Sequence, residues 1–195
     1  MRTSECDIVI VGVGGQGVIL ISDVIGRAGV MAGKPVRGAE THGMAQRGGS
    51  VINHTRIGCR FSPMVASGGA DVLVALEPAE ALRFAHFLSP NGVALINTRQ
   101  VLPVTVTTGA ARYPPLEEIL VPLEGLCRRA VPMDATAIAK KAGTAQAMNV
   151  VMLGALARYI PLKEELILEA LCDVVPPKFL DANKKAFSLG KAEVE

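Results

Sequence analysis

The sequence predicts an α/β fold, with a Rossmann-like, mostly parallel sheet flanked by helices and a helical C-terminal region. Three observations support this fold class. Hydrophobic residues make up 50% of the 195 residues but aromatic residues only 4%, and this aliphatic composition suits strands that are buried on both faces. Apolar runs alternate with helical segments, as in βαβ units. A glycine-rich turn follows the first apolar run and precedes a helix.

Strand and helix alternate through the first half of the chain. Each predicted strand is a β-branched run or an alternating segment that ends at a turn signal. The strands are predicted at residues 7–11, 35–40, 50–57, 70–76 and 93–97. The helices are predicted at residues 17–32 and 77–88, with a turn at residues 89–92. The second of these strands has a poor composition for a strand.

The second half of the chain is predicted to be mostly helical. Residues 104–108 predict an exposed or edge strand, and residues 130–134 predict a last strand. Helices are predicted at residues 115–126, 135–142, 149–159, 163–174 and 177–189. The apolar positions of the last helix are Phe179, Leu180, Ala186 and Phe187. We therefore expect a single domain over residues 1–195, made of an α/β core (1–134) and a helical extension (135–195).

Bulk composition excludes several classes of protein. The formal net charge is +2 and no long Lys/Arg cluster exists, so we expect no nucleic-acid partner. The longest apolar stretch, residues 8–21, contains four glycines and is too short to span a membrane. No secretory signal is recognisable, so we expect a cytoplasmic location. The four cysteines form no CxxC pair, which predicts free thiols rather than an iron–sulfur cluster or a structural zinc.

Residues 12–17 (GVGGQG), here called the glycine loop, match the GxGxxG pattern. They follow a predicted strand and open a predicted helix, where free N–H groups at the helix N-terminus can bind an anion. A dinucleotide-binding fold also needs an acidic residue about 20 residues further on, and Glu40 is a candidate. The motif alone leaves two interpretations open: a phosphate-binding loop, or a tight turn without a ligand.

The segment at residues 41–51 (THGMAQRGGSV) combines three glycines with a histidine, a glutamine and an arginine. It suits neither a helix nor a half-buried strand. It is therefore either a mobile surface loop or a loop shaped for contact, and the residues alone favour the mobile loop.

No catalytic machinery is recognisable in the sequence. The three histidines, His42, His54 and His86, lack metal-ligand spacing, and there is no HExxH motif, GxSxG elbow or Walker A loop. The chain thus fits a noncatalytic subunit, or a cofactor-binding protein whose chemistry lies elsewhere.

Two long segments together resemble a known family. They are DIVIVGVGGQGVILISDVIGRAGVMAG at residues 7–33 and GAETHGMAQRGGSVINHTRIG at residues 38–58. Both closely resemble the gamma-type subunit or domain of the 2-oxoacid:ferredoxin oxidoreductases, and ETHGMAQRGGSV is most similar to the indolepyruvate branch. Weaker similarity continues through ADVLVALEPAEALRF, SPNGVALIN and AMNVVMLGAL.

The resemblance implies that the chain is the small (beta) subunit of such an enzyme. The whole enzyme would oxidatively decarboxylate an aryl 2-oxoacid to its acyl-CoA, releasing CO₂ and reducing ferredoxin. Thiamine diphosphate and 4Fe-4S clusters would belong to the large alpha subunit, and CoA would be a cosubstrate. The small subunit would bind no cofactor firmly, would hold no metal or catalytic residue, and would be inactive alone.

The resemblance also implies which residues form the site. The glycine loop becomes a candidate for a CoA phosphate, and the 41–51 segment becomes a contact loop that faces the partner or its substrate. The glycine-loop candidates are Gly12, Gly14, Gly15, Gln16 and Gly17. The contact-loop candidates are Thr41, His42, Gln46, Arg47, Gly48 and Gly49. In an isolated subunit we expect the contact loop to be mobile, because its contacts are missing.

Two other classes of protein stay open beside this one. A stand-alone Rossmann-type nucleotide-binding oxidoreductase or adenylylating enzyme would need a real second strand ending in Glu40 and a set of catalytic residues. A scaffold protein with an empty Rossmann fold would not change the activity of a thiamine-dependent partner.

Overall fold

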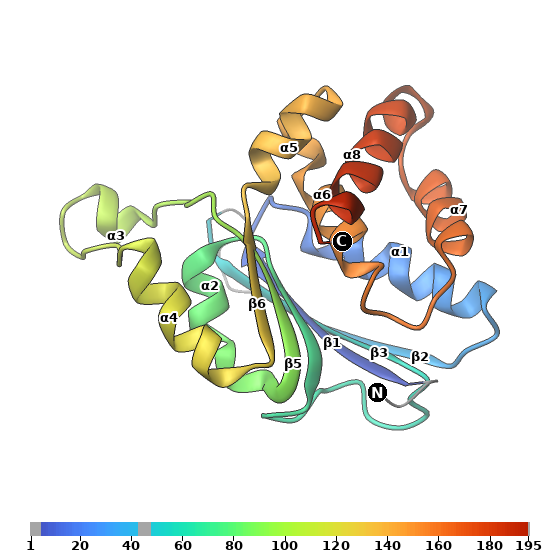
Figure 1. Cartoon of the computed structure of the whole chain (residues 1–195), viewed down its shortest axis with the longest axis horizontal. Helices are drawn as coiled ribbons and strands as arrows, with labels where there is room; N and C mark the ends of the chain where they lie inside the picture. The colour runs from blue at the N-terminus through green and yellow to red at the C-terminus, as the bar shows by residue number, and fades with distance from the viewer. Residues whose placement is uncertain (1–4, 43–47, 195) are drawn as a thin grey trace.

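A six-stranded sheet forms the centre of the computed structural model, which describes residues 5–42 and 48–194. The strands lie side by side in the order β2-β3-β1-β4-β5-β6 (Figure 1). They are β1 (Cys6–Val13), β2 (Val36–His42), β3 (Ser50–Ile57), β4 (Ala70–Ala75), β5 (Leu88–Asn97) and β6 (Arg129–Met133). Strands β1, β4, β5 and β6 pair in parallel, whereas β3 runs antiparallel to both β1 and β2. The predicted α/β class with a mostly parallel sheet is confirmed.

Strand β3 separates β2 from β1, so the sheet departs from the order of a dinucleotide-binding fold, in which the first two strands are neighbours. The β2 segment has few good strand formers, but it pairs with β3 along its whole length, from Val36 opposite Ile57 to His42 opposite Val51. This pairing overrides the weak local preference of the segment. The predicted strand at 35–40 is therefore real, and it forms one edge of the sheet.

Helices cover both faces of the sheet (Figure 1). One face carries α1 (Val18–Met31), α5 (Ala135–Ala142), α6 (Met148–Leu156), α7 (Glu164–Val174) and α8 (Leu180–Ala192). The other face carries α2 (Pro78–Arg83) and α4 (Leu116–Leu126). Alternate residues of β1 serve the two layers, since Ile8 and Ile10 join one apolar cluster and Val9 and Val11 join the other. This alternation is the period of two expected of a strand buried on both faces.

The remaining helical segments are short. They are η1 (Ala85–Phe87), α3 (Val104–Thr107), η2 (Ala145–Ala147) and η3 (Pro177–Phe179). In the described part of the chain, no helix is long and apolar enough to cross a membrane.

Two local predictions were wrong. Residues 104–108 were expected to form a strand, but Val104–Thr107 form α3. The Thr108 N–H donates to the Val104 carbonyl at 2.9 Å, which closes a helical turn. Residues 89–92 lie within β5 instead of in a turn, beside an irregular register with β4. Phe179, an apolar position of the predicted last helix, lies in η3 before α8 and is 42% exposed, with Lys178 Nζ 4.8 Å from the centre of its ring.

The C-terminal helices are held by a very close crossing of α6 and α8. A Cβ atom at Gly154 would lie 2.0 Å from the carbonyl oxygen of Phe187, and one at Gly190 would lie 1.9 Å from that of Val151. No side chain fits at either position, so the two backbones approach each other directly. Helix α6 is buried over its whole length between α8 and the sheet.

Candidate functional site

The two loops selected from the sequence meet at the carboxyl edge of β1. The Gly14 N–H donates to the Gly49 carbonyl at 2.8 Å, and the Gly48 N–H donates to the Gly14 carbonyl at 3.5 Å. Pairing between β1 and β3 brings them together, because Val13 lies opposite Ser50. In an open α/β sheet, ligands bind at this edge, where neighbouring connections leave in opposite directions.

Of the other predicted contact-loop residues, those that the structure describes lie at the end of β2. Thr41 lies exposed near the end of β2, and His42 is the last residue of that strand. Gln46 and Arg47, together with the predicted mobility of their loop, lie outside the described residues.

Gln16 closes the glycine loop with its side chain. Its Oε1 accepts the Val13 N–H at 2.7 Å, and its Nε2 donates to the Leu76 carbonyl at 3.0 Å. The side chain therefore connects the ends of β1 and β4, which are neighbours in the sheet. It also explains Gly12, because a Cβ there would lie 2.9 Å from Gln16 Oε1. Both polar atoms of the Gln16 side chain thus bond within the protein and brace the loop from inside.

Gly17 ends the loop at a second internal contact. Its backbone has φ of +85°, and a Cβ would lie 2.1 Å from Nδ2 of Asn149, a side chain at the start of α6 that is only 6% exposed. The same Nδ2 donates to the Gly17 carbonyl at 3.5 Å. The AMNVVMLGAL segment therefore supports the glycine loop from the other end of the sequence.

These bonds determine which backbone N–H groups of the glycine loop can still bind a ligand. The N–H groups of Val13, Gly14 and Gln16 all donate to acceptors within the protein. The first N–H groups of α1 have no intrahelical acceptor, and this helix has no side-chain N-cap and no acid in its first turn. Helix α1 begins at a cavity of about 270 Å³. The residues that line this cavity are Val13, Gly14, Gly15, Gly17, Val18, Ile19 and Val51. Within the described part of the chain, an anion such as a phosphate could therefore bind at the start of α1, and none of the described lining residues of that cavity is charged.

Two buried glutamates beside this edge were not predicted from the sequence. Glu77 is 1% exposed and caps α2, where its Oε2 accepts the Glu80 N–H at 3.1 Å. Its Oε1 accepts the Val101 N–H at 3.3 Å and a short hydrogen bond from the Tyr113 hydroxyl. Burial first, and then the bond to Glu77, raise the pKa of Tyr113 well above its usual range. The only sequence signal was an acid between a buried strand and Pro78.

Glu80 is 5% exposed and bonds to the start of β3. Its Oε2 accepts a short hydrogen bond from the Ser50 hydroxyl, and its Oε1 pairs with Arg83 Nε at 3.2 Å. Burial raises the pKa of Glu80, although the Ser50 hydrogen bond and the Arg83 charge oppose that shift. A carboxylate from α2 thus contacts Ser50, which lies near the end of the 41–51 segment and begins β3.

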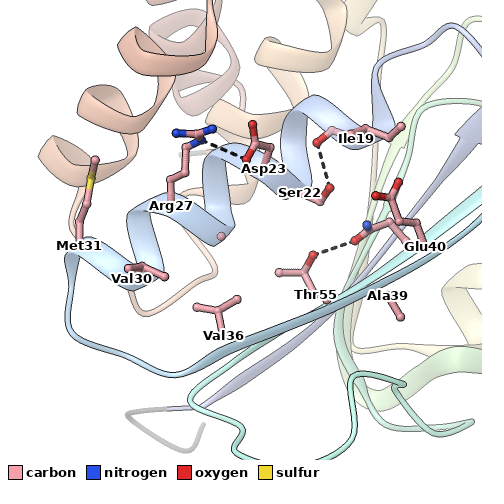
Figure 2. Close-up of a pocket in the computed structure, with 13 residues that line it drawn as sticks. Ile19, Ser22, Asp23, Arg27, Val30, Met31, Val36, Ala39, Glu40 and Thr55 are labelled. Carbon is pink, nitrogen blue, oxygen red and sulfur yellow. Dashed lines mark hydrogen bonds and ion pairs between the residues drawn. The ribbon is translucent and has the colours of Figure 1, made fainter.

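A groove of about 730 Å³ lies between α1 and the β2–β3 edge (Figure 2). Buried Asn53 and Thr55 form its floor, where the Thr55 hydroxyl donates to Asn53 Oδ1 at 2.8 Å. An ion pair between Asp23 and Arg27, at 3.0 Å, lies on the α1 side, and Glu40 lines the β2 side.

Glu40 does lie on a real strand, as a nucleotide-binding enzyme would require. Because β3 separates that strand from β1, Glu40 does not hold the position next to the first strand that binds a ribose in a dinucleotide fold. The groove therefore does not reproduce the nucleotide site that the alternative function needs.

The histidines and cysteines show no catalytic arrangement in the described residues. His54 is buried, its Nδ1 accepts the Val65 N–H at 3.4 Å, and burial lowers its pKa. His86 is exposed on η1. Burial, and then Asp71, raise the pKa of the Cys6 thiol to about 12, which suits an inert core thiol. No group of three or more His, Cys, Asp or Glu residues within 5–42 and 48–194 is placed to hold a metal ion.

Comparison with known proteins identifies the family. The family model described as pyruvate ferredoxin/flavodoxin oxidoreductase matches residues 7–193. The chain belongs to this family. The predicted resemblance is therefore confirmed, and the chain is a small subunit of an oxidoreductase complex of the pyruvate ferredoxin/flavodoxin oxidoreductase family.

Relatives within this family cover nearly the whole chain. Indolepyruvate oxidoreductase subunit IorB of Archaeoglobus fulgidus is 49% identical over 186 residues, which are 94% of this chain and 92% of that protein. IorB of Thermococcus kodakarensis is 43% identical over 95% of this chain and 94% of that protein. The structure of pyruvate oxidoreductase subunit PORC from Thermotoga maritima has a TM-score of 0.70 at 26% identity, and covers 97% of this chain and 96% of that one.

Proposed function

We propose that the chain is the small (beta) subunit of an indolepyruvate:ferredoxin oxidoreductase, which converts aryl 2-oxoacids to acyl-CoA and reduces ferredoxin. The relatives named IorB, which match this chain almost end to end, support the substrate class. The observation that carries a role at the active site is the direct bonding of the two loops, from Gly14 to Gly49 at 2.8 Å. The most distinctive residues of the resemblance thus lie at one edge of the sheet.

We assign the cofactors to the partner. The large alpha subunit would hold thiamine diphosphate, which supplies the carbanion chemistry when bound, and the 4Fe-4S clusters that pass electrons to ferredoxin. CoA would enter as a cosubstrate. The small subunit's own residues would then bind, orient and exclude water at the shared site, and would hold no cofactor firmly.

The proposed partner-facing residues are those around the loop junction. Gly48 and Gly49 are bonded to the glycine loop, at the edge of the sheet where α1 begins. We propose that this edge faces the large subunit, with a CoA phosphate at the first turn of α1. The partner-facing set is Thr41, His42, Gln46, Arg47, Gly48 and Gly49. The glycine-loop set is Gly12, Gly14, Gly15, Gln16 and Gly17.

We further propose that the α/β core (1–134) and the helical extension (135–195) act as one unit. Helix α7 packs along α1, and α6 packs against the sheet. A movement of the extension would therefore disturb the Gly17–Asn149 contact and the glycine loop with it.

Co-expression with a candidate large subunit tests the proposed function. Anaerobic assays would follow CoA-dependent reduction of ferredoxin, or of a viologen dye, by indolepyruvate. We expect the two subunits to co-purify and the activity to need both. Lack of co-purification and of any gain in activity would exclude the proposed function.

Two variants address the two loops separately. We expect Arg47→Ala to lower the activity of the complex about tenfold, as the loss of an arginine at an interface often does, while Arg60→Ala, at an exposed arginine of the next loop, leaves it unchanged. Calorimetric titration of CoA into complexes with and without Gly14→Val tests the glycine loop. Unchanged CoA affinity would remove this loop from CoA binding.

A further inference from the structure

Glu80 has an unusual orientation for its place in α2. Glu77 is the N-cap of the helix and Glu80 lies three residues later, where a glutamate ordinarily folds back onto the backbone of the cap. Here the carboxylate instead accepts a hydrogen bond from the Ser50 hydroxyl, 30 residues earlier in the chain. The first turn of α2 is thereby joined to the start of β3.

Stability alone does not explain this carboxylate. Glu80 is 5% exposed, and Glu77, which is 1% exposed, lies in the same helical turn. Burying a carboxylate costs free energy, and well-packed apolar residues often replace buried ionic groups without loss of stability. The partial pairing with Arg83, whose side chain is 60% exposed, is weak compensation.

The position of Ser50 in the sheet shows what its hydrogen bond to Glu80 achieves. Ser50 lies opposite Val13, at the last pair of the β1–β3 ladder. The residue before it, Gly49, accepts the Gly14 N–H at 2.8 Å. A continuous path of bonds therefore runs from Glu80 through Ser50 and Gly49 to the glycine loop.

We propose that Glu80 is a positioning residue, whose hydrogen bond to Ser50 fixes the Gly48–Ser50 turn against the glycine loop. The geometry with which the two loops meet is thus set from α2, on the opposite face of the sheet from α1. Its effect on the complex rests on the proposed function, whereas the positioning itself does not.

Hydrogen exchange of the full chain tests the positioning directly. The probe is the Gly14 amide, whose protection depends on the Gly49 carbonyl. We expect Ser50→Ala and Glu80→Ala each to accelerate its exchange about tenfold, and the double variant to add nothing further, because both changes remove one bond. Glu80→Gln keeps an acceptor for the Ser50 hydroxyl, so it should restore near-normal exchange.

The controls separate local from global effects. Arg83→Gln removes the ion pair but leaves the Ser50 bond, and should leave Gly14 exchange unchanged. The amide of Leu95, in the centre of β5, reports global stability and should not change in any variant. Unchanged Gly14 exchange in Ser50→Ala would overturn the proposal even if Glu80→Ala failed to fold. Independent, multiplying effects of the two changes would overturn it as well.

The complex gives a second, separable readout. Ser50→Ala and Glu80→Ala should weaken association with the large subunit about tenfold, in proportion to the exchange effect, while Glu80→Gln should not. If the wild-type chain failed to bind that subunit, the proposed function would fail, and the exchange measurements would still decide the role of Glu80.

Discussion

The glycine loop after β1 and the crossing of α6 with α8 both depend on glycine, but for different reasons. In the loop, a side chain at Gly17 would meet another side chain, that of Asn149, and the backbone adopts a positive φ. At the crossing, side chains at Gly154 and Gly190 would meet the backbone of the facing helix, at about half the distance of a normal contact. The approach is similarly close in the two regions, at 2.1 Å in the loop and at 2.0 and 1.9 Å at the crossing, so the difference is that a side chain can move aside whereas a helix backbone cannot.

Gly190→Ala should produce the largest loss of stability. The new Cβ would lie 1.9 Å from the Val151 carbonyl oxygen, and α6 and α8 would have to separate, so we expect a loss of about 4 kcal/mol or more. Urea unfolding followed by circular dichroism measures it. The control is Gly26→Ala within α1, where no atom lies within 4 Å of the new Cβ and alanine should be neutral or slightly stabilising. Equal stability of both variants would show that the crossing is loose.

Gly17→Ala should cost less, about 2 kcal/mol, because one clash involves a side chain and the rest is backbone strain at φ of +85°. The double variant Gly17→Ala/Asn149→Ala separates these contributions. Removing the Asn149 side chain should recover the steric part and leave the strain. If the loss of unfolding free energy in the double variant equalled the sum of the losses in the two single variants, the contact between the two residues would be contradicted.

Gly15→Ala should show the strain alone. Its backbone has φ of +100°, yet no atom lies within 4 Å of a Cβ built there. We expect a loss of about 1 kcal/mol, measured in the same urea series. A loss as large as that of Gly17→Ala would mean that the loop is more tightly surrounded than its contacts indicate.

The smallest expected effect is a pH dependence of the free energy of unfolding, and it comes from His54 in β3 instead of from either glycine site. Burial lowers the pKa of His54 below its ordinary value of 6.5, so the folded chain resists protonation more than the unfolded chain does. His54 therefore contributes stability that is present above pH 6.5 and is lost as the pH falls through its folded pKa. The free energy of unfolding should fall more between pH 7.5 and 5.5 in the wild type than in His54→Gln, and equal slopes would contradict this.

The sequence predicted those elements whose signal is local. Continuous β-branched runs such as residues 7–11 and 70–76 predicted buried strands, and the glycine loop was placed correctly between a strand and a helix. Pairing was not predictable in the same way, because β3 enters between β1 and β2 through contacts between distant segments. The meeting of Gly14 with Gly49 depends on that pairing.

The residues whose roles were not predicted also depend on contacts between distant segments. Glu77 and Glu80 fall at the start of the predicted helix at residues 77–88, where acidic residues are common. Their hydrogen bonds come from Tyr113 and Ser50, which are far away in the sequence. Gly154 lies inside the predicted helix at residues 149–159, where glycine lowers helix propensity, and Gly190 directly follows the predicted helix at residues 177–189. Their role depends on a neighbouring helix that no local pattern reveals.

The antiparallel placement of β3 has a consequence for how such a protein can diversify. Strands β2 and β3 form a hairpin whose stem is fixed by regular pairing up to His42 and Val51. The connection between them can change in length or composition without altering the stem, as surface connections generally can. Because Gly48 and Gly49, at the end of that connection, bond to the glycine loop, we expect substitutions in the connection to change what the loop junction can contact while the paired stem stays the same.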